Sequence, residues 1–160
     1  MQAGSFSSYL ANPYGFAIYF VTLWCAACFV ISLVSGWFRL ASSFRRESDP
    51  LGKTRNVGPM FYGVSMRFWT NYNGVIRLSA ADDALYLSVF FLFRVGHPPL
   101  RVPWGEIQIE KKKFLFQTYV LLTLGNRDRI PMRISKRMAR NLGILDQTSA
   151  NELTLPVISR

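Results

Sequence analysis

Hydrophobic and polar positions divide the chain into two unlike parts at Arg39, which carries the first charge in the sequence. The 23 residues before it, 16–38, form an unbroken apolar segment. At about 1.5 Å per residue they make a helix about 34 Å long, enough for a hydrocarbon core about 30 Å thick. The segment is too long and too apolar to be enclosed by a domain of this size. The pattern therefore predicts a transmembrane helix over 16–38, after a short extracytoplasmic tail over 1–15.

The charges around this segment predict its fate and orientation. The tail has no Lys or Arg, so the basic start of a signal peptide is missing, and the apolar run exceeds the ~7–15 residues usual there. Small residues over 32–36 keep cleavage as a minor alternative to a retained anchor. Basic residues follow the segment, and the positive-inside rule then places the C-terminal part in the cytoplasm and the N-terminus outside.

One face of the predicted helix carries Cys28, Ser32 and Gly36 at four-residue spacing. Small residues at this spacing let two helices approach closely, so the face is a candidate contact with a second copy or a membrane partner. Small residues are also common in such helices without any role in packing. The interpretation as a helix-packing face therefore stands beside a purely compositional one.

Residues 39–59 are expected to be a juxtamembrane helix extension and a linker. The helix should continue to about Arg46, with an apolar stripe of Trp37, Leu40 and Phe44 lying along the membrane interface. Aromatic rings favour that interface, and arginines near it reach phosphates by snorkelling. The predicted juxtamembrane anchor consists of Trp37, Arg39, Arg45 and Arg46.

From residue 60 the apolar positions alternate with period two, which is typical of strands with one buried face. A turn signal, Gly125–Asp128, separates the last two strands as in a hairpin. Ser135 then offers an N-cap and Gly143 a C-cap to a short helix over 136–142. We expect about six or seven antiparallel strands closed by this helix over 60–145, and a tail over 146–160. The alternation predicts strands over 74–79, 84–91, 106–110, 118–124 and 129–134.

Two motifs within these strands carry a family resemblance. They are Leu85-Tyr86-Leu87 and the apolar-Pro-Trp-x-x-Ile segment Val102-Pro103-Trp104-Gly105-Glu106-Ile107. Together with the later hairpin and closing helix, they resemble the small bacterial pleckstrin-homology-like (PH-like) and GRAM-like domains. The resemblance implies an α+β fold, a mostly antiparallel PH-like barrel or sandwich closed by a C-terminal helix, and implies no activity.

The same resemblance bears on location. Similar proteins often tether the domain to a membrane helix, which implies a bacterial inner membrane here. The junction Gly36-Trp37-x-x-Leu40-Ala41 is also similar to that of an uncharacterised bacterial set.

The net charge is +10, and all charges follow the apolar segment. Such asymmetry favours a domain beside an anionic surface, where each basic residue contributes about 1 kcal/mol. Aromatic residues of the FWTNYNG segment are additional candidates for headgroup contact. The alternative is a solvated positive face that only reflects the positive-inside rule. The candidate lipid- or partner-binding residues are Lys111, Lys112, Lys113, Arg127, Arg129, Arg133, Lys136, Arg137, Arg140, Trp69 and Tyr72.

Residues suited to catalysis are few. His97 is the only histidine, and Cys25 and Cys28 form a CxxC inside the apolar segment, where thiolates and additional ligands are disfavoured. The adjacent Asp82 and Asp83 lie between two predicted strands, as turn residues do. No P-loop, dinucleotide-binding or GxSxG motif occurs. We expect no enzyme, no catalytic or metal site and no cofactor.

Two functions remain. The first is a non-enzymatic single-pass membrane protein whose domain contacts anionic headgroups or scaffolds a complex at the inner face. The second is a protein-interaction subunit, such as an assembly factor, regulator or toxin-neutralising membrane protein, which uses a groove or strand edge. Nucleic-acid binding is not expected, because it needs aromatic and basic residues interleaved on one sheet face.

Overall fold

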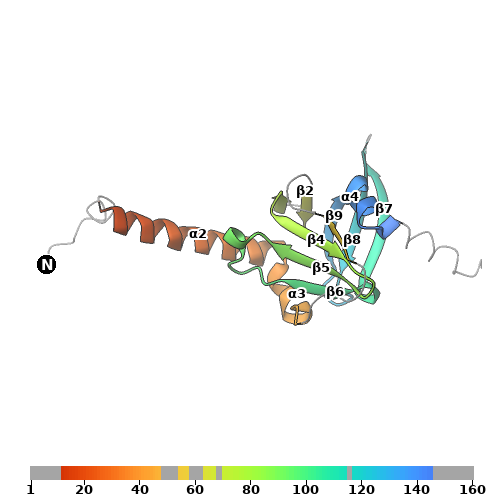
Figure 1. The fold of residues 1–160 in the computed structure, drawn as a ribbon, viewed down its shortest axis with the longest axis horizontal. Coiled ribbons are helices and arrows are strands. Elements are labelled where there is room, and N and C mark those ends of the chain that lie inside the picture. The colour runs from red at the N-terminus through yellow and green to blue at the C-terminus, as the bar shows by residue number, and fades with distance from the viewer. Residues whose placement is uncertain (1–11, 48–53, 58–62, 68–69, 115–116, 146–160) are drawn as a thin grey trace, which may run out of the picture.

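The computed structural model of the chain describes residues 12–47, 54–57, 63–67, 70–114 and 117–145. Helix α2, Pro13–Ser35, projects from one end of a small antiparallel β domain (Figure 1). It is long and apolar enough to cross a membrane, and most of its surface is exposed. The expected apolar N-terminal helix, antiparallel β domain and C-terminal helix are thus confirmed.

The ends of α2 follow from local chemistry. The side chain of Asn12 caps the first turn by accepting a hydrogen bond from the Tyr14 amide at 3.1 Å, and Pro13 suits the first helical position. The helix ends at Gly36, whose φ of +81° is the left-handed conformation that glycine adopts without strain. The predicted continuous helix to Arg46 is therefore wrong, because the chain turns at Gly36 and starts a second helix, α3, Trp37–Phe44.

The strands form two antiparallel sheets. Two short 3₁₀ helices, η1 (Phe91–Phe93) and η2 (Trp104–Glu106), lie between strands. The first sheet has the order β1-β4-β5-β6, from Arg55–Val57, Ile76–Ala80, Ala84–Val89 and Leu100–Pro103. The second has the order β3-β2-β9-β8-β7, from Thr70–Asn73, Gly63–Met66, Ile130–Ser135, Gln117–Leu124 and Ile107–Phe114.

Alternating side chains of both sheets meet in one core. Leu78 and Leu87 of the first sheet and Leu122 and Met132 of the second are fully buried in the same cluster. Within the described ranges no strand pairing joins the two sheets, so they do not close into a barrel. These ranges hold nine strands rather than six or seven, because β1, β2 and β3 have only three or four residues each, too few to show a clear period.

Helix α4, Lys136–Asn141, follows β9 and packs on β8, β9 and β1. Its cap is the predicted one: Ser135 Oγ accepts a hydrogen bond from the Met138 amide at 3.2 Å. Gly143 follows with a φ of +73°, as expected for a C-terminal glycine. Met138 is fully buried, so this short helix is held by the sheet rather than by its own stability.

Helix α3 belongs to the core of the β domain. Trp37 and Leu40 have no exposed surface, and Phe44 packs partly buried beside them. The indole Nε1 of Trp37 donates a hydrogen bond to the Pro98 carbonyl at 2.9 Å. The expectation that this stripe lies along the membrane interface therefore fails, since the turn at Gly36 directs it into the sheets. Trp37 is a core residue rather than an interfacial anchor.

Candidate membrane-facing site

Among the described strands and the loops between them, the loop between β5 and β6, residues 90–99, carries the most exposed large apolar side chains. The exposed fractions are 69% for Phe91, 52% for Leu92 and 41% for Val95. A water-soluble loop rarely presents such a contiguous apolar patch. We call residues 90–95 the apolar loop. It lies alongside the half of α2 that is nearer the domain (Figure 1).

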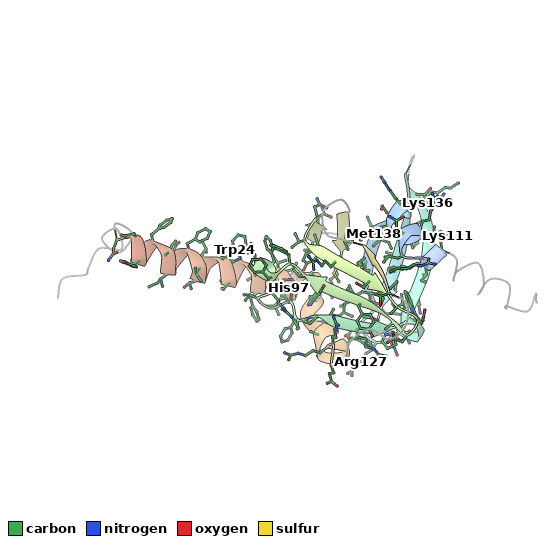
Figure 2. All side chains as sticks on the ribbon, viewed as in Figure 1. Trp24, His97, Lys111, Arg127, Lys136 and Met138 are labelled. Atoms are coloured by element: carbon green, nitrogen blue, oxygen red, sulfur yellow. The ribbon has the colours of Figure 1, made fainter. Side chains whose placement is uncertain are left out.

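Specific contacts hold this loop against α2. The indole Nε1 of Trp24 donates a hydrogen bond to the Leu92 carbonyl at 2.9 Å, and its ring lies 5.1 Å from that of Phe93 (Figure 2). Further along α2, Ser32 Oγ donates to the Gly96 carbonyl. A Cβ at Gly96 would lie 3.1 Å from Cβ of Ser32, so the two backbones approach as closely as glycine permits.

These contacts change the interpretation of the small-residue face. Cys28 and Ser32 are buried against the chain's own domain, and Gly36 faces the side chain of Ile130. Small residues do permit close approach here, as their spacing suggested. In this structure the small residues pack against the loop and sheet of the chain's own domain instead of against a second helix.

A buried polar cluster lies where α2, α3, β3 and the loop meet. The Tyr72 hydroxyl is 2.8 Å from both Ser35 Oγ and His97 Nε2, and the ring of His97 lies 5.3 Å from that of Trp37. The Tyr72 hydroxyl donates to Ser35 Oγ. His97 Nδ1 lies 3.0 Å from the Val95 carbonyl, which can only accept, so Nδ1 is the donor there. Every member of the cluster thus has a partner, which makes the junction rigid.

Burial governs the protonation of this cluster. Tyr72 is only 6% exposed, and burial raises its pKa to about 12. Burial also lowers the pKa of His97, against hydrogen bonds to backbone carbonyls that raise it. At neutral pH both side chains are therefore uncharged. Tyr72 was expected to dip into headgroups, but in the structure it is a core residue whose hydroxyl serves the junction.

Arginines surround the base of the apolar loop. On one side Arg46, Arg77 and Arg94 line a groove of about 610 Å³, together with Phe90 and Phe91; Glu47 lines it too. The guanidinium of Arg46 stacks 5.4 Å from the centre of the Tyr86 ring.

A second groove, of about 570 Å³, lies on the other side of the loop. Arg45 and Arg94 line it, along with Phe38 and Ser42 of α3. Arg94 thus borders both grooves. The apolar loop and the arginines beside it together form what we call the candidate membrane-facing site. Its basic residues are Arg45, Arg46, Arg77 and Arg94.

The structure divides the basic residues expected to form one face. Lys111 on β7 and Lys136 on α4 lie at the end of the domain away from α2, whereas Arg127 lies toward α3 (Figure 2). The distal elements β7, β9 and α4 carry Lys111, Lys112, Lys113, Arg133, Lys136, Arg137 and Arg140.

Local contacts occupy some of these residues. Lys112 forms an ion pair with Glu110 at 3.0 Å, and the guanidinium of Arg133 lies 5.4 Å from the centre of the Tyr119 ring. Arg127 and Arg129 belong to the turn between β8 and β9, which lies against Phe44 of α3. Trp69 lies outside the described residues, and Arg39 is exposed on α3.

Sequence reasoning missed Arg77 and Arg94. Arg77 is an outward position of the β4 alternation, with nothing in the sequence to link it to the loop. Arg94 ends the run FFLFR, in which four large apolar residues precede one charge. The first two residues of that run were predicted to end the strand over 84–91, but β5 ends at Val89, and Phe90, Phe91 and Leu92 are exposed. An apolar run longer than its strand was the available signal.

Potential metal ligands do not gather in the part of the chain that the structure describes. Those residues contain no group of three His, Cys, Asp or Glu side chains placed to hold a metal ion. Comparisons with protein-family models, curated proteins and solved structures found no match. The PH-like and GRAM-like resemblance therefore stays a prediction that rests on the two quoted motifs.

Proposed function

We propose that this chain is a non-enzymatic single-pass membrane protein whose PH-like cytoplasmic domain binds anionic lipid headgroups at the inner face of the membrane. The observation that carries the proposal is the ring of arginines around two grooves at the end of the domain from which α2 leaves. A transmembrane α2 brings these grooves to headgroup level.

The chemistry of arginine supports this choice of ligand. Its planar guanidinium offers paired donors to phosphate oxygens and remains charged at every physiological pH. Near an anionic surface each such residue contributes about 1 kcal/mol, so two of them change lipid preference by about 30-fold if their contributions add. We propose no lipid contact for the distal lysines on β7 and α4, because they lie at the end of the domain away from α2.

The test compares lipid preference between two matched variants of the full chain. Spin-labelled phosphatidylglycerol and phosphatidylcholine are added to the reconstituted protein, and electron paramagnetic resonance measures the protein-bound fraction of each. We expect R77Q/R94Q to lose most of the preference for phosphatidylglycerol. The control K111Q/K113Q removes the same charge from the distal end and should keep the preference.

Equal loss in both variants would mean that only net charge matters, and would contradict a site at the arginines. No preference in the unaltered chain would contradict headgroup binding altogether. High salt should weaken the preference in the unaltered chain, because the screening length of exposed charges falls from about 8–10 Å at ordinary ionic strength to about 3 Å at 1 M salt.

A second candidate function uses a strand edge as the binding surface. β7 is an eight-residue strand at the edge of its sheet, where β8 is its one partner among the described strands, and exposed lysines run along it. An acidic segment of a membrane partner could add a strand there. Under this candidate, K111Q/K113Q would release a co-purified partner and R77Q/R94Q would not, the reverse of the lipid experiment.

A further inference from the structure

The depth at which the apolar loop contacts α2 restricts where the loop can lie. Trp24, which holds Leu92, precedes Gly36 by 12 positions, or about 18 Å of helix. The part of α2 that extends beyond this contact, 13–23, is about 16 Å long, roughly half of the hydrocarbon thickness. A loop in water would therefore leave too little helix to cross the bilayer.

We propose that the apolar loop enters the hydrocarbon of the cytoplasmic leaflet beside α2, as a second membrane-embedded element whose partner is lipid acyl chains. The proposal shares with the proposed function only the assumption that α2 spans the membrane, and it does not require headgroup binding by the arginines.

The carbonyl groups of the loop suit such an environment. Non-helical backbone is tolerated at membrane depth only where it is buried in protein or lines a water-filled cavity, so the loop keeps its backbone against the domain and α2 and turns only side chains to lipid. The hydrogen-bond partners of these carbonyl groups are amides within the loop, the Trp24 indole, the Ser32 hydroxyl and the imidazole of His97. The carbonyl oxygens that accept a hydrogen bond are those of Phe90, Phe91, Leu92, Arg94, Val95 and Gly96.

The side chains change from apolar to basic in the direction of the membrane surface. Phe91 and Leu92 are exposed at the level of Trp24, where acyl chains would surround them. Arg94 is the one charged residue of the loop, and its long side chain lines grooves shared with Arg45 and Arg46 after α3. This position suits an arginine such as Arg94, whose backbone lies at the edge of the hydrocarbon and whose guanidinium reaches toward the phosphates.

The opposite end of the same β4–β5 hairpin shows the contrast. The turn there contains Asp82, which is exposed, and Asp83, which forms an ion pair with Arg101 at 2.9 Å. β5 thus begins after an acidic turn and ends at the apolar loop, which is continuous with the lipid-facing surface of α2. Continuity with α2 favours lipid over a protein partner as the occupant of this surface.

The depth of the loop is measured in the full chain with a spin label at L92C, and a label at D82C is the control. Both are made in a C25A/C28A chain and reconstituted in pure phosphatidylcholine, which keeps the result independent of anionic headgroups. We expect the label at 92 to be several-fold more accessible to oxygen than to a water-soluble nickel complex. The label at 82 should show the reverse. A label at 92 that is as accessible to nickel as the label at 82 would overturn the proposal.

A second measurement keeps both cysteines and identifies what surrounds the loop. Benzoylphenylalanine replaces Phe91 in the full chain within membranes, and mass spectrometry identifies the photoproducts. Lipid adducts at 91, absent when the same group replaces Asp82, are the expected result. Adducts only with a second copy or another protein would show that a protein covers the loop, and would reject acyl chains as its partner.

Discussion

At the scale of single residues, the junction depends on one uncharged histidine. His97 is 2% exposed and is held between the Tyr72 hydroxyl and the Val95 carbonyl. The titratable group facing it is Tyr72, which is neutral because burial raises its pKa to about 12. Protonation of His97 would therefore place an uncompensated charge between α2 and the sheets. Such a charge is costly where water is excluded.

This arrangement predicts that stability falls with pH below about 6.5, the ordinary pKa of histidine. Burial lowers the pKa of His97 in the folded chain, so between the two pKa values the unfolded chain binds a proton that the folded chain does not. The free energy of unfolding should be flat above that range and decrease as the pH falls through it. Thermal unfolding of the full chain in detergent, measured from pH 8 to pH 5, tests this.

The variant H97Q supplies the control for the pH series. It keeps hydrogen-bonding capacity but has no group that titrates in this range, so its unfolding midpoint should vary less between pH 8 and pH 5. An equal decline in H97Q would assign the pH dependence to other groups.

At the scale of elements, the break between α2 and α3 decides how the helix meets the domain. The turn at Gly36 sends Trp37 and Leu40 into the core instead of along the membrane. The core therefore includes residues before the expected domain boundary at 60. A fragment that begins at residue 47 would lack two fully buried side chains, and burying each contributes about 1.5–3 kcal/mol.

The break predicts a large difference between two Gly-to-Ala substitutions. At Gly36, φ is +81° and a Cβ would lie 2.7 Å from Cδ1 of Ile130, so G36A should destabilise the chain by about 1–3 kcal/mol. A Cβ at Gly105 would meet nothing within 4 Å, so G105A should change stability by less than about 0.5 kcal/mol. Unfolding of both variants in the same detergent measures the difference.

If G36A and G105A behaved alike, the left-handed conformation of Gly36 and its close approach to Ile130 would not be required, and α2 and α3 would be able to form one continuous helix. The comparison thus also tests the kinked connection on which the position of the apolar loop depends.

At the scale of the whole molecule, polarity is graded along the long axis. An apolar helix lies at one end, the arginine-lined grooves follow it, and the lysines of β7 and α4 lie at the far end (Figures 1 and 2). Under the proposed function, in which α2 crosses a membrane, the grooves would lie at headgroup level and the far end would face solvent. The expected orientation rests on the positive charge that follows the helix.

The expected orientation is N-terminus outside and domain in the cytoplasm. An impermeant maleimide should label S7C in intact cells and K112C only after the membrane is opened. The unaltered chain, whose two cysteines lie on α2, supplies the background. Labelling of K112C in intact cells would reverse the orientation and remove anionic inner-leaflet lipid as the ligand.

Local patterns were sufficient for much of the architecture. The uncharged run of α2, the alternation in β4, β8 and β9, and the caps of α4 are set by neighbours in sequence, and the structure has all of them. β5 is a strand as predicted, but it is buried on both faces instead of alternating. Pro131 of β9 lies beyond the last pair that β2 forms with β9, where a missing amide is tolerated.

Contacts between distant residues decided the rest. Ser32 contacts Gly96, 64 positions away, and Tyr72 contacts Ser35, 37 positions away. The small-residue face of α2, which suggested packing against a second helix, therefore packs against the loop between β5 and β6. Arg77 and Arg94 became one site because β4 and the apolar loop end at the same side of the domain.

The sequence by itself thus determined that the chain has one apolar helix and one small basic β domain, because hydropathy and strand period act over a few residues. Only the tertiary structure decided which charges lie beside α2 and which apolar residues stay exposed. Those properties depend on which surfaces meet after folding, and no local pattern contains that information.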